Sequence, residues 1–354
     1  MRHRSSENIV GVDFGAPRWA RDQRRKIIAI EARPTDVRRY RIEATGLNER
    51  LLATDPLGWS AAELLDELLT RPVHVVGFDF PFSVPEALLW DQDFACDVGE
   101  RFGPFRGWRR FSSFVAQTLK LTDPLDFGPF EAWRSRDDRA RLWTKRATNV
   151  AARGQPPLKD KFQSVFQMTL LGNALLSRMW DSKRYRVMPF GGPSEENEAI
   201  EVYPAATLRC MGLTSYKSRP EEAIRLAIGA CRAAGVMLDV DLRVIAFCCR
   251  YDSGGRTPDH DGADAFVALC TAILYRDGHV EWRSTATGCR FDPRELSGCP
   301  TSTSRPMRRL ARCQRRFRDE AGGDEDVWTW DEIAEFRTLV LSVLNARGVM
   351  GSLG

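Results

Sequence analysis

The chain has 354 residues, of which 43% are hydrophobic and 28% are charged, with a formal net charge of +4. This is the balance of an ordinary globular protein, and a chain of this length buries a large core without disulfides or metals to hold it together. The length allows either one elaborated domain or two modest ones, and the small net charge excludes no class of partner.

The sequence pattern argues against a signal peptide, a membrane span and a zinc site. Residues 1–9 are polar and charged, so we expect no signal peptide, and no apolar run reaches the 18 residues of a membrane span. The nine cysteines include the adjacent pair Cys248 and Cys249 but no C-x-x-C spacing, and the four histidines are scattered. We therefore expect a soluble, cytoplasmic protein with reduced thiols and without zinc.

The first third of the chain predicts an antiparallel meander followed by a strand–helix–strand unit. Residues 8–14, 26–32 and 38–43 have the apolar or alternating pattern of strands, and turn residues separate the last two. Ser60 is placed to cap a helix over residues 61–69, and residues 73–78 form an apolar fourth strand. Such a unit usually makes a right-handed parallel crossover.

The remainder predicts a helical insertion, a fifth strand and several helices. Residues 82–198 are aromatic, basic and mostly helical in pattern. Strand 199–203 follows, and Pro204 is well placed to begin a helix. Further helices are predicted at 163–180, 205–210, 221–234, 261–275 and 328–346. The predicted fold is α/β, with a mixed five-stranded sheet flanked by helices. It comprises a domain at 1–300, which contains the insertion, and a basic helical extension at 301–354.

Two arginine clusters are candidates for contact with nucleic acid. Residues 301–318 contain seven arginines and no acid, and Arg308 and Arg312 lie among them. Arg109 belongs to a second cluster, residues 101–111, in which arginines alternate with aromatic residues. Arginine beside aromatic rings suits phosphate contact and base stacking, although charge runs are commonly just a solvated surface.

Two strand ends share the pattern V-G-apolar-D-F, at residues 10–14 and 76–80. In each, the glycine and the aspartate, Asp13 or Asp79, are two residues apart and face the same side of the sheet. If the strands are parallel neighbours, both carboxylates emerge at the carboxyl edge, where open α/β sheets bind ligands. Two such carboxylates repel each other, and a divalent cation such as Mg²⁺ relieves that repulsion. A single aspartate at such a place is otherwise a turn residue or a helix cap.

Three more acids are candidate ligands. Glu201 is flanked by apolar residues in the predicted fifth strand, where the alternative is an edge residue facing water. Asp261 and Asp264 are three residues apart at a helix N-terminus, where the alternative is a helix cap and a favourable charge in the first turn. Small residues beside Asp264 would let this helix approach the sheet closely, so Asp264 is favoured over Asp261 for chemistry.

Four blocks of the sequence carry a resemblance to a known family. VGVDFGAP, VGFDFPFSVP, IEVYPAATL and DHDGADAFVALCTAI, in that order, are similar to a family catalogued as a domain of unknown function and described as predicted RNase H-like nucleases. The last block also resembles the final acidic motif of bacterial Holliday-junction resolvases, which share that fold. The blocks span residues 9–273 and leave the insertion and the tail unexplained.

The resemblance implies an RNase H-like sheet that holds two Mg²⁺ or Mn²⁺ ions and hydrolyses phosphodiester bonds of DNA or RNA. By position, Asp13, Asp79 and Asp264 would be catalytic and metal-binding, with Glu201 or Asp261 assisting. Typical RNase H enzymes also place a glutamate on the helix after the third strand, and the glutamates on that helix here lie outside the matching blocks. Phosphate-binding candidates from the insertion are Lys145, Arg146, Lys159 and Lys161.

Two other functions share this fold. An ATP-dependent phosphotransferase of the actin and sugar-kinase superfamily would show a similar D-x-G turn, at residues 13–15, but it needs a second copy of the domain. A non-catalytic module for nucleic acid or protein would keep the fold and lose the chemistry. Such a module has no need of converging acids. Measurable binding of Mn²⁺ would therefore count against this alternative.

Overall fold

The computed structural model describes residues 7–52, 58–121, 123–136, 145–146, 149, 155–159, 165–194, 196–213, 216–250 and 260–279. The chain divides into two compact units, Met1–Thr287 and Gly288–Gly354, and all of the described residues belong to the first. The predicted extension at 301–354, with its helix at 328–346, lies outside the described residues. The boundary expected at residue 300 therefore stays a prediction.

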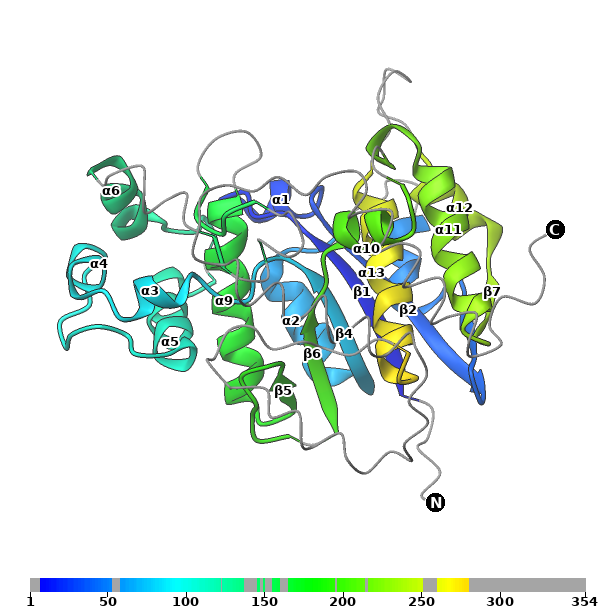
Figure 1. The fold of residues 1–354 in the computed structure, drawn as a ribbon, viewed down its shortest axis with the longest axis horizontal. Coiled ribbons are helices and arrows are strands. Elements are labelled where there is room, and N and C mark those ends of the chain that lie inside the picture. Colours follow the sequence, from blue (N-terminus) through cyan, green and yellow to red (C-terminus); the bar gives the residue numbers. More distant parts are fainter. Residues whose placement is uncertain are drawn as a thin grey trace, which may run out of the picture. The chain divides into compact units, whose positions relative to one another are not determined.

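A mixed seven-stranded sheet forms the centre of this unit, in the order β5-β6-β4-β1-β2-β3-β7 (Figure 1). The strands are β1 (Asn8–Phe14), β2 (Ile27–Asp36), β3 (Arg39–Ile42), β4 (Val73–Asp79), β5 (Tyr185–Val187), β6 (Asn197–Glu201) and β7 (Met237–Val240). Pairs β1–β2 and β2–β3 are antiparallel, and all other neighbours are parallel. Five of these strands were predicted, whereas the edge strands β5 and β7 are too short to give a sequence signal.

Helices cover both faces of the sheet, so the α/β class with a helix-flanked mixed sheet is confirmed. One hydrophobic cluster joins α2 (Ala61–Thr70) and α9 (Val165–Asp181) to one face, and a second joins α11 (Pro220–Ala233), α12 (Leu242–Cys248) and α13 (Asp261–Arg276) to the other. The remaining described elements are α1 (Ala20–Gln23), α3 (Glu86–Leu89), α4 (Gln92–Asp97), α5 (Trp108–Leu119), α6 (Gly128–Arg136), α10 (Pro204–Cys210) and the 3₁₀ turns η1 (Gly46–Leu52) and η2 (Tyr216–Ser218). Among the helices that the structure describes, none is long and apolar enough to cross a membrane.

In its described residues, the segment between β4 and β6 contains several helices, as predicted, together with the short strand β5, and its helices form two different parts. Parallel strands require a crossover, and α9 supplies it from a position in the helical layer beside α2. Helices α3 to α6 form the insertion proper, at the left of Figure 1. Three aromatic residues of the arginine-rich cluster, Phe105, Trp108 and Phe111, are buried in its core, and Phe102 is 87% exposed.

Helix α13 crosses β1 and β4 at very short range. A Cβ atom added to Gly11 would lie 2.1 Å from the backbone nitrogen of Leu269 and 2.5 Å from the carbonyl oxygen of Ala265. At Gly77, opposite Gly11 in the parallel register, a Cβ atom would lie 3.1 Å from the carbonyl oxygen of Ala268. The glycines of the two V-G-apolar-D-F strands therefore make room for the helix backbone, which the small residues of α13 also permit.

This contact predicts that Gly11→Ala strongly destabilises the protein. The added methyl group would meet helix backbone, which cannot turn aside as a side chain can, so we expect a loss of about 3 kcal/mol or more in the free energy of unfolding, the upper range of overpacking. Gly229→Ala is the matched control, because its Cβ meets nothing within 4 Å on an exposed turn of α11. That change should stabilise by roughly 0.5–1 kcal/mol. Urea titrations that give the two variants equal midpoints would contradict the close contact.

Candidate metal centre

Three aspartates converge where β1 and β4 end. One carboxylate oxygen each from Asp13, Asp79 and Asp264 lies within 4.8 Å of the others, and this is the one group of three or more possible metal ligands within the described part of the chain. Asp13 is 9% exposed and Asp264 is 3% exposed. The elements that carry them, β1, β4 and α13, lie side by side near the centre of Figure 1.

The local structure explains why these three side chains meet. Asp13 and Asp79 are direct partners in the parallel register of β1 and β4, so both carboxylates emerge at the carboxyl edge as predicted. Asp264 lies in the first turn of α13, and its amide donates to the carbonyl of His260 at 2.9 Å. Gly11 and Gly77 precede Asp13 and Asp79 by two residues, and α13 packs against both glycines. The first turn of α13 therefore lies directly over the two aspartates.

Burial and mutual repulsion raise the pKa of each carboxyl. For Asp13 the largest cause is burial, followed by the charges of Asp261, Asp264 and Asp79. Burial, with the charge of Asp264, also raises the pKa of Asp79 well above its usual range. The pKa of Asp264 rises to about 7, again mainly through burial. At neutral pH the site therefore opposes full ionisation unless a cation joins it.

Asp264 has an unmet hydrogen-bonding capacity that fits a metal ion. Its Oδ1 atom is buried without a hydrogen-bond partner among the described residues, and the hydroxyl of the buried Tyr216 bonds to this carboxyl group. A buried, unpartnered carboxylate oxygen is expensive, and hard divalent cations take such oxygens as ligands. The donor set, the burial and the orphaned oxygen therefore fit Mg²⁺ or Mn²⁺ bound by Asp13, Asp79 and Asp264.

Asp261 borders this cluster without belonging to it. Its Oδ2 atom accepts from the Nζ of Lys26 at 2.9 Å, and its Oδ1 atom lies 3.8 Å from the Nε2 of His260. Asp261 is the first residue of α13, and His260, one residue earlier than expected, occupies the N-cap. The structure thus brings Asp264, and not Asp261, into the cluster with Asp13 and Asp79.

Glu201 lies at the end of β6 and is fully engaged by other groups. Its two oxygens accept from the guanidinium of Arg146 at 2.8 and 2.5 Å, and Oε2 also accepts from the amide of Phe82 at 2.9 Å. Its charge is close enough to contribute to the raised pKa of Asp79. Glu201 therefore adjoins the three-carboxylate cluster but is neutralised by Arg146.

Three other residues predicted to bind phosphate, Lys145, Lys159 and Arg109, also lie in the described part of the chain. Lys145 is exposed, and the Nζ of Lys159 donates to Gln155 at 2.7 Å. Arg109 donates to Ser177 at 2.8 Å and to Asp181, which ties it to α9. Lys161, Arg308 and Arg312 lie outside the described residues.

Two basic residues and a tyrosine near the site were not anticipated from the sequence. Tyr216 reaches Asp264 from η2, and the next residue, Lys217, is exposed with its Nζ 3.1 Å from the Nε2 of His260. The positive charge of Lys217 opposes the rise in pKa of all three clustered aspartates. Lys26 approaches from the start of the hairpin strand β2. None of the three carries a motif, because only tertiary packing brings them here.

The two glutamates on the helix after the third strand have other roles. Glu63 completes a capping box with Ser60 at the start of α2 and binds Arg24 and Arg50. Glu67 pairs with Arg71 at a distance of 2.5 Å. The glutamate that typical RNase H enzymes place on this helix is therefore not supplied by either residue.

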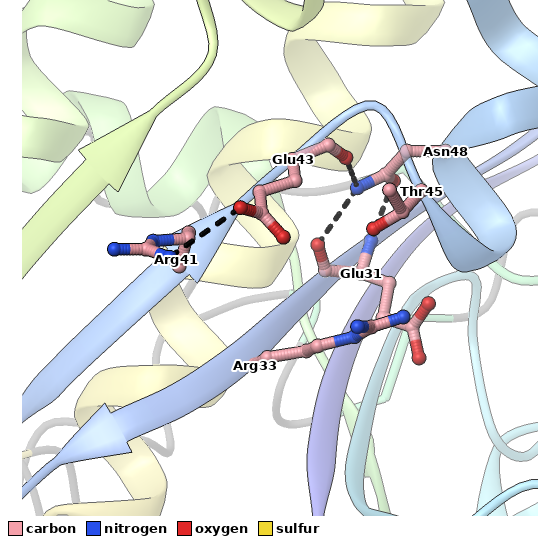
Figure 2. Close-up of a pocket in the computed structure, with 6 residues that line it drawn as sticks. All are labelled: Glu31, Arg33, Arg41, Glu43, Thr45 and Asn48. Carbon is pink, nitrogen blue, oxygen red and sulfur yellow. Dashed lines mark hydrogen bonds and ion pairs between the residues drawn. The ribbon is translucent and has the colours of Figure 1, made fainter.

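A polar hollow at β2, β3 and η1 is separate from the acidic cluster. Figure 2 shows its lining residues: Glu31, Arg33, Arg41, Glu43, Thr45 and Asn48. The side-chain amide of Asn48 donates to the carbonyls of Glu31 and Glu43 and accepts from the amide of Glu31, as the dashed lines indicate. Through these hydrogen bonds Asn48 holds η1 against β2, so this part of the hollow is a structural junction.

No family model, curated protein or solved structure matches this chain in the comparisons.

The raised pKa values predict that the metal-free protein loses stability as the pH rises. In the unfolded chain Asp264 releases its proton near pH 4, whereas in the fold it holds it to about pH 7, so the folded state binds more protons between these values. Stability is therefore highest at low pH in this window and falls as the pH rises through it, by about 4 kcal/mol over the whole window from Asp264 alone, of which about 2.5–3 kcal/mol falls between pH 5 and pH 8. Chemical denaturation in EDTA at pH 5 and pH 8 measures the fall, and Asp264→Asn should reduce it.

Glu63 provides a control of opposite sign. Its hydrogen bonds from Arg24, above all, lower its pKa to about 2, so its contribution is present above its unfolded pKa and is lost as the pH falls through about 2. Glu63→Gln should therefore lower stability at pH 8 and leave the downward slope of stability between pH 5 and pH 8 intact. An Asp264→Asn variant with the same slope as the wild type would contradict the assigned electrostatics.

Proposed function

We propose that this protein is a metal-dependent nuclease that hydrolyses phosphodiester bonds in a nucleic acid. The observation that carries the proposal is the convergence of Asp13, Asp79 and Asp264, with a buried Asp264 oxygen that lacks a partner. Closely placed, unpaired carboxylates are unfavourable to folding unless they serve a ligand. The oxygen-only donor set favours Mg²⁺ or Mn²⁺ over softer metals.

The arrangement of the central strands supports the RNase H-like assignment. Within the seven-stranded sheet, the order β3-β2-β1-β4-β6 joins an antiparallel meander to two further strands parallel to β1. We propose that these five strands are the RNase H-like sheet that the resemblance implies, with β5 and β7 as additions at its edges. The acids lie on β1, on β4 and on the late helix α13, as the resemblance of the four sequence blocks implies.

The chain's own residues would bind and orient the reacting groups. Asp13 and Asp79 present oxygens from two rigid strands, and Asp264 closes the third side from α13. A divalent cation bound there would supply Lewis-acid chemistry, activating water and stabilising charge on a phosphoryl oxygen. Tyr216 orients the Asp264 carboxyl group, and Lys217 offers a positive charge beside the cluster for the phosphate of the substrate.

A cleavage assay tests the function directly. The full chain is incubated with labelled single- and double-stranded DNA and RNA in Mg²⁺, Mn²⁺ or EDTA. We expect metal-dependent cleavage of at least one substrate, and an Asp13→Asn, Asp79→Asn double variant should lose it by about 10³-fold or more, because ligands and activated water are lost together. Glu198→Gln is a control from the same sheet, because Glu198 pairs with Arg186 outside the cluster.

The two other functions are outcomes of this assay. Binding of nucleic acid without cleavage, in a protein that also fails to bind Mn²⁺ at millimolar concentration, would overturn the nuclease in favour of a binding module. Metal-dependent ATP hydrolysis or phosphoryl transfer without cleavage of nucleic acid would favour the phosphotransferase.

Lys217 provides a separate prediction about the substrate. The side chain of Lys217 is exposed and is not one of the proposed metal ligands, so Lys217→Met should leave the fold intact. Loss of its contact with a substrate phosphate should raise the KM for nucleic acid about tenfold. Steady-state kinetics at several salt concentrations should show a shallower salt dependence for the variant. Lys183→Met is the control, because Lys183 is exposed and precedes β5 at the opposite edge of the sheet. An unchanged KM in Lys217→Met would remove Lys217 from the substrate site.

A further inference from the structure

We infer that this centre holds one divalent cation, because Arg146 and Lys26 already neutralise Glu201 and Asp261, the two flanking acids that a second ion would use. The inference rests on the metal-binding part of the proposed function and not on the identity of the substrate. Five carboxylates gather at this edge of the sheet, and they form two groups. Asp13, Asp79 and Asp264 are clustered and face one another, whereas Glu201 and Asp261 each hold a cationic side chain.

The Arg146–Glu201 pair is a built part of the structure. The side chains of Arg146 and Glu201 are only 10% and 21% exposed, and the pair is bidentate. Asn149 accepts from the Nε of Arg146 at 2.8 Å, and the amide of Phe82 donates to Glu201. Both glutamate oxygens are therefore occupied. An ion bound by Glu201 would have to displace a buried guanidinium and leave it unpaired, which is strongly unfavourable.

The Lys26–Asp261 pair neutralises the acid on the other flank. Lys26 lies beside the turn that follows β1, because its carbonyl accepts from the amide of Gly15 at 2.7 Å. From there its Nζ reaches Asp261 at 2.9 Å. Asp261 makes the largest charge contribution to the raised pKa of Asp13, so the two acids are close neighbours. Lys26 thus supplies positive charge between β1 and the start of α13.

The balance of charge agrees with one ion. Leaving the imidazole of His260 uncounted, the five ionised carboxylates are accompanied by Arg146, Lys26 and Lys217, which carry three positive charges. Two negative charges remain, which a single divalent cation neutralises. A second divalent ion would leave an excess of positive charge in a buried, low-dielectric site, where like charges repel strongly. The excess positive charge would repel Arg146 and Lys26, which already form ion pairs with Glu201 and Asp261.

Isothermal titration of the full, metal-free chain with Mn²⁺ tests the number of ions without reference to cleavage. We expect one ion per chain, with affinity lowered by at least about tenfold in Asp264→Asn. Electron paramagnetic resonance should show isolated Mn²⁺ without the exchange coupling of a close pair. Two ions of similar affinity would overturn the inference and leave the nuclease proposal standing. Binding of no ion would overturn both.

Variants of the flanking cations test their role. Arg146→Gln releases Glu201, so we expect a second, weaker Mn²⁺ ion to bind beside Asp79. Arg186→Gln is the matched control, because it releases Glu198 on the same strand β6 but at the far end of α13, and it should keep one ion. If thermal melting shows that Arg146→Gln does not fold, Lys26→Met makes the same test at Asp261 from a side chain that is 56% exposed. A folded variant that still binds one ion would overturn the role assigned to that cation.

Discussion

The close approach of α13 to the paired glycines of β1 and β4 sets the geometry on which the candidate site depends. Side chains at Gly11 and Gly77 would hold the helix away from the sheet. Without them, helix backbone lies almost in contact with strand backbone, and the first turn of α13 comes down over the carboxyl edge. The carboxylate of Asp264 then meets Asp13 and Asp79 without any loop having to position it. The site is thus built on rigid elements, which favours precise placement of ligands.

The treatment of buried acids elsewhere in the molecule shows how unusual this cluster is. Glu31 is 2% exposed, yet its carboxylate accepts from Asn8 and from the amide of Leu47 at 2.9 Å, and Arg71 lies nearby. Hydrogen-bond donors and Arg71 therefore satisfy the Glu31 carboxylate, as expected of an acid with a structural role. Asp264 is buried to a similar degree but retains an unpartnered oxygen and two acidic neighbours. Folding alone gives no reason for that arrangement, whereas the binding of a cation does.

The sequence predicted the parts of the site that repeat or lie close together along the chain. The two V-G-apolar-D-F strands predicted aligned aspartates because strand periodicity fixes which residues share a face. The small residues around Asp264 predicted a closely packed helix. Lys26, Tyr216 and Lys217 could not be predicted, because each reaches the site through tertiary packing and lacks a motif. Arg146 was predicted to contact phosphate, but its partner Glu201 is 55 residues away and no local pattern joins the two. Edge strands β5 and β7 were missed because three or four residues carry too little periodicity.

The hydrophobic cluster on one face of the sheet also continues into the insertion. Val10 and Phe78 of the strands belong to the same apolar cluster as Phe94 and Trp133 of the insertion, through Phe80 and α9. Because no solvent layer separates them, the insertion and the sheet share one cooperative unit. Amide hydrogens in α5 should therefore exchange with solvent through the same opening event as those in β4. Deletion of the insertion would remove side chains that belong to the hydrophobic core of the sheet.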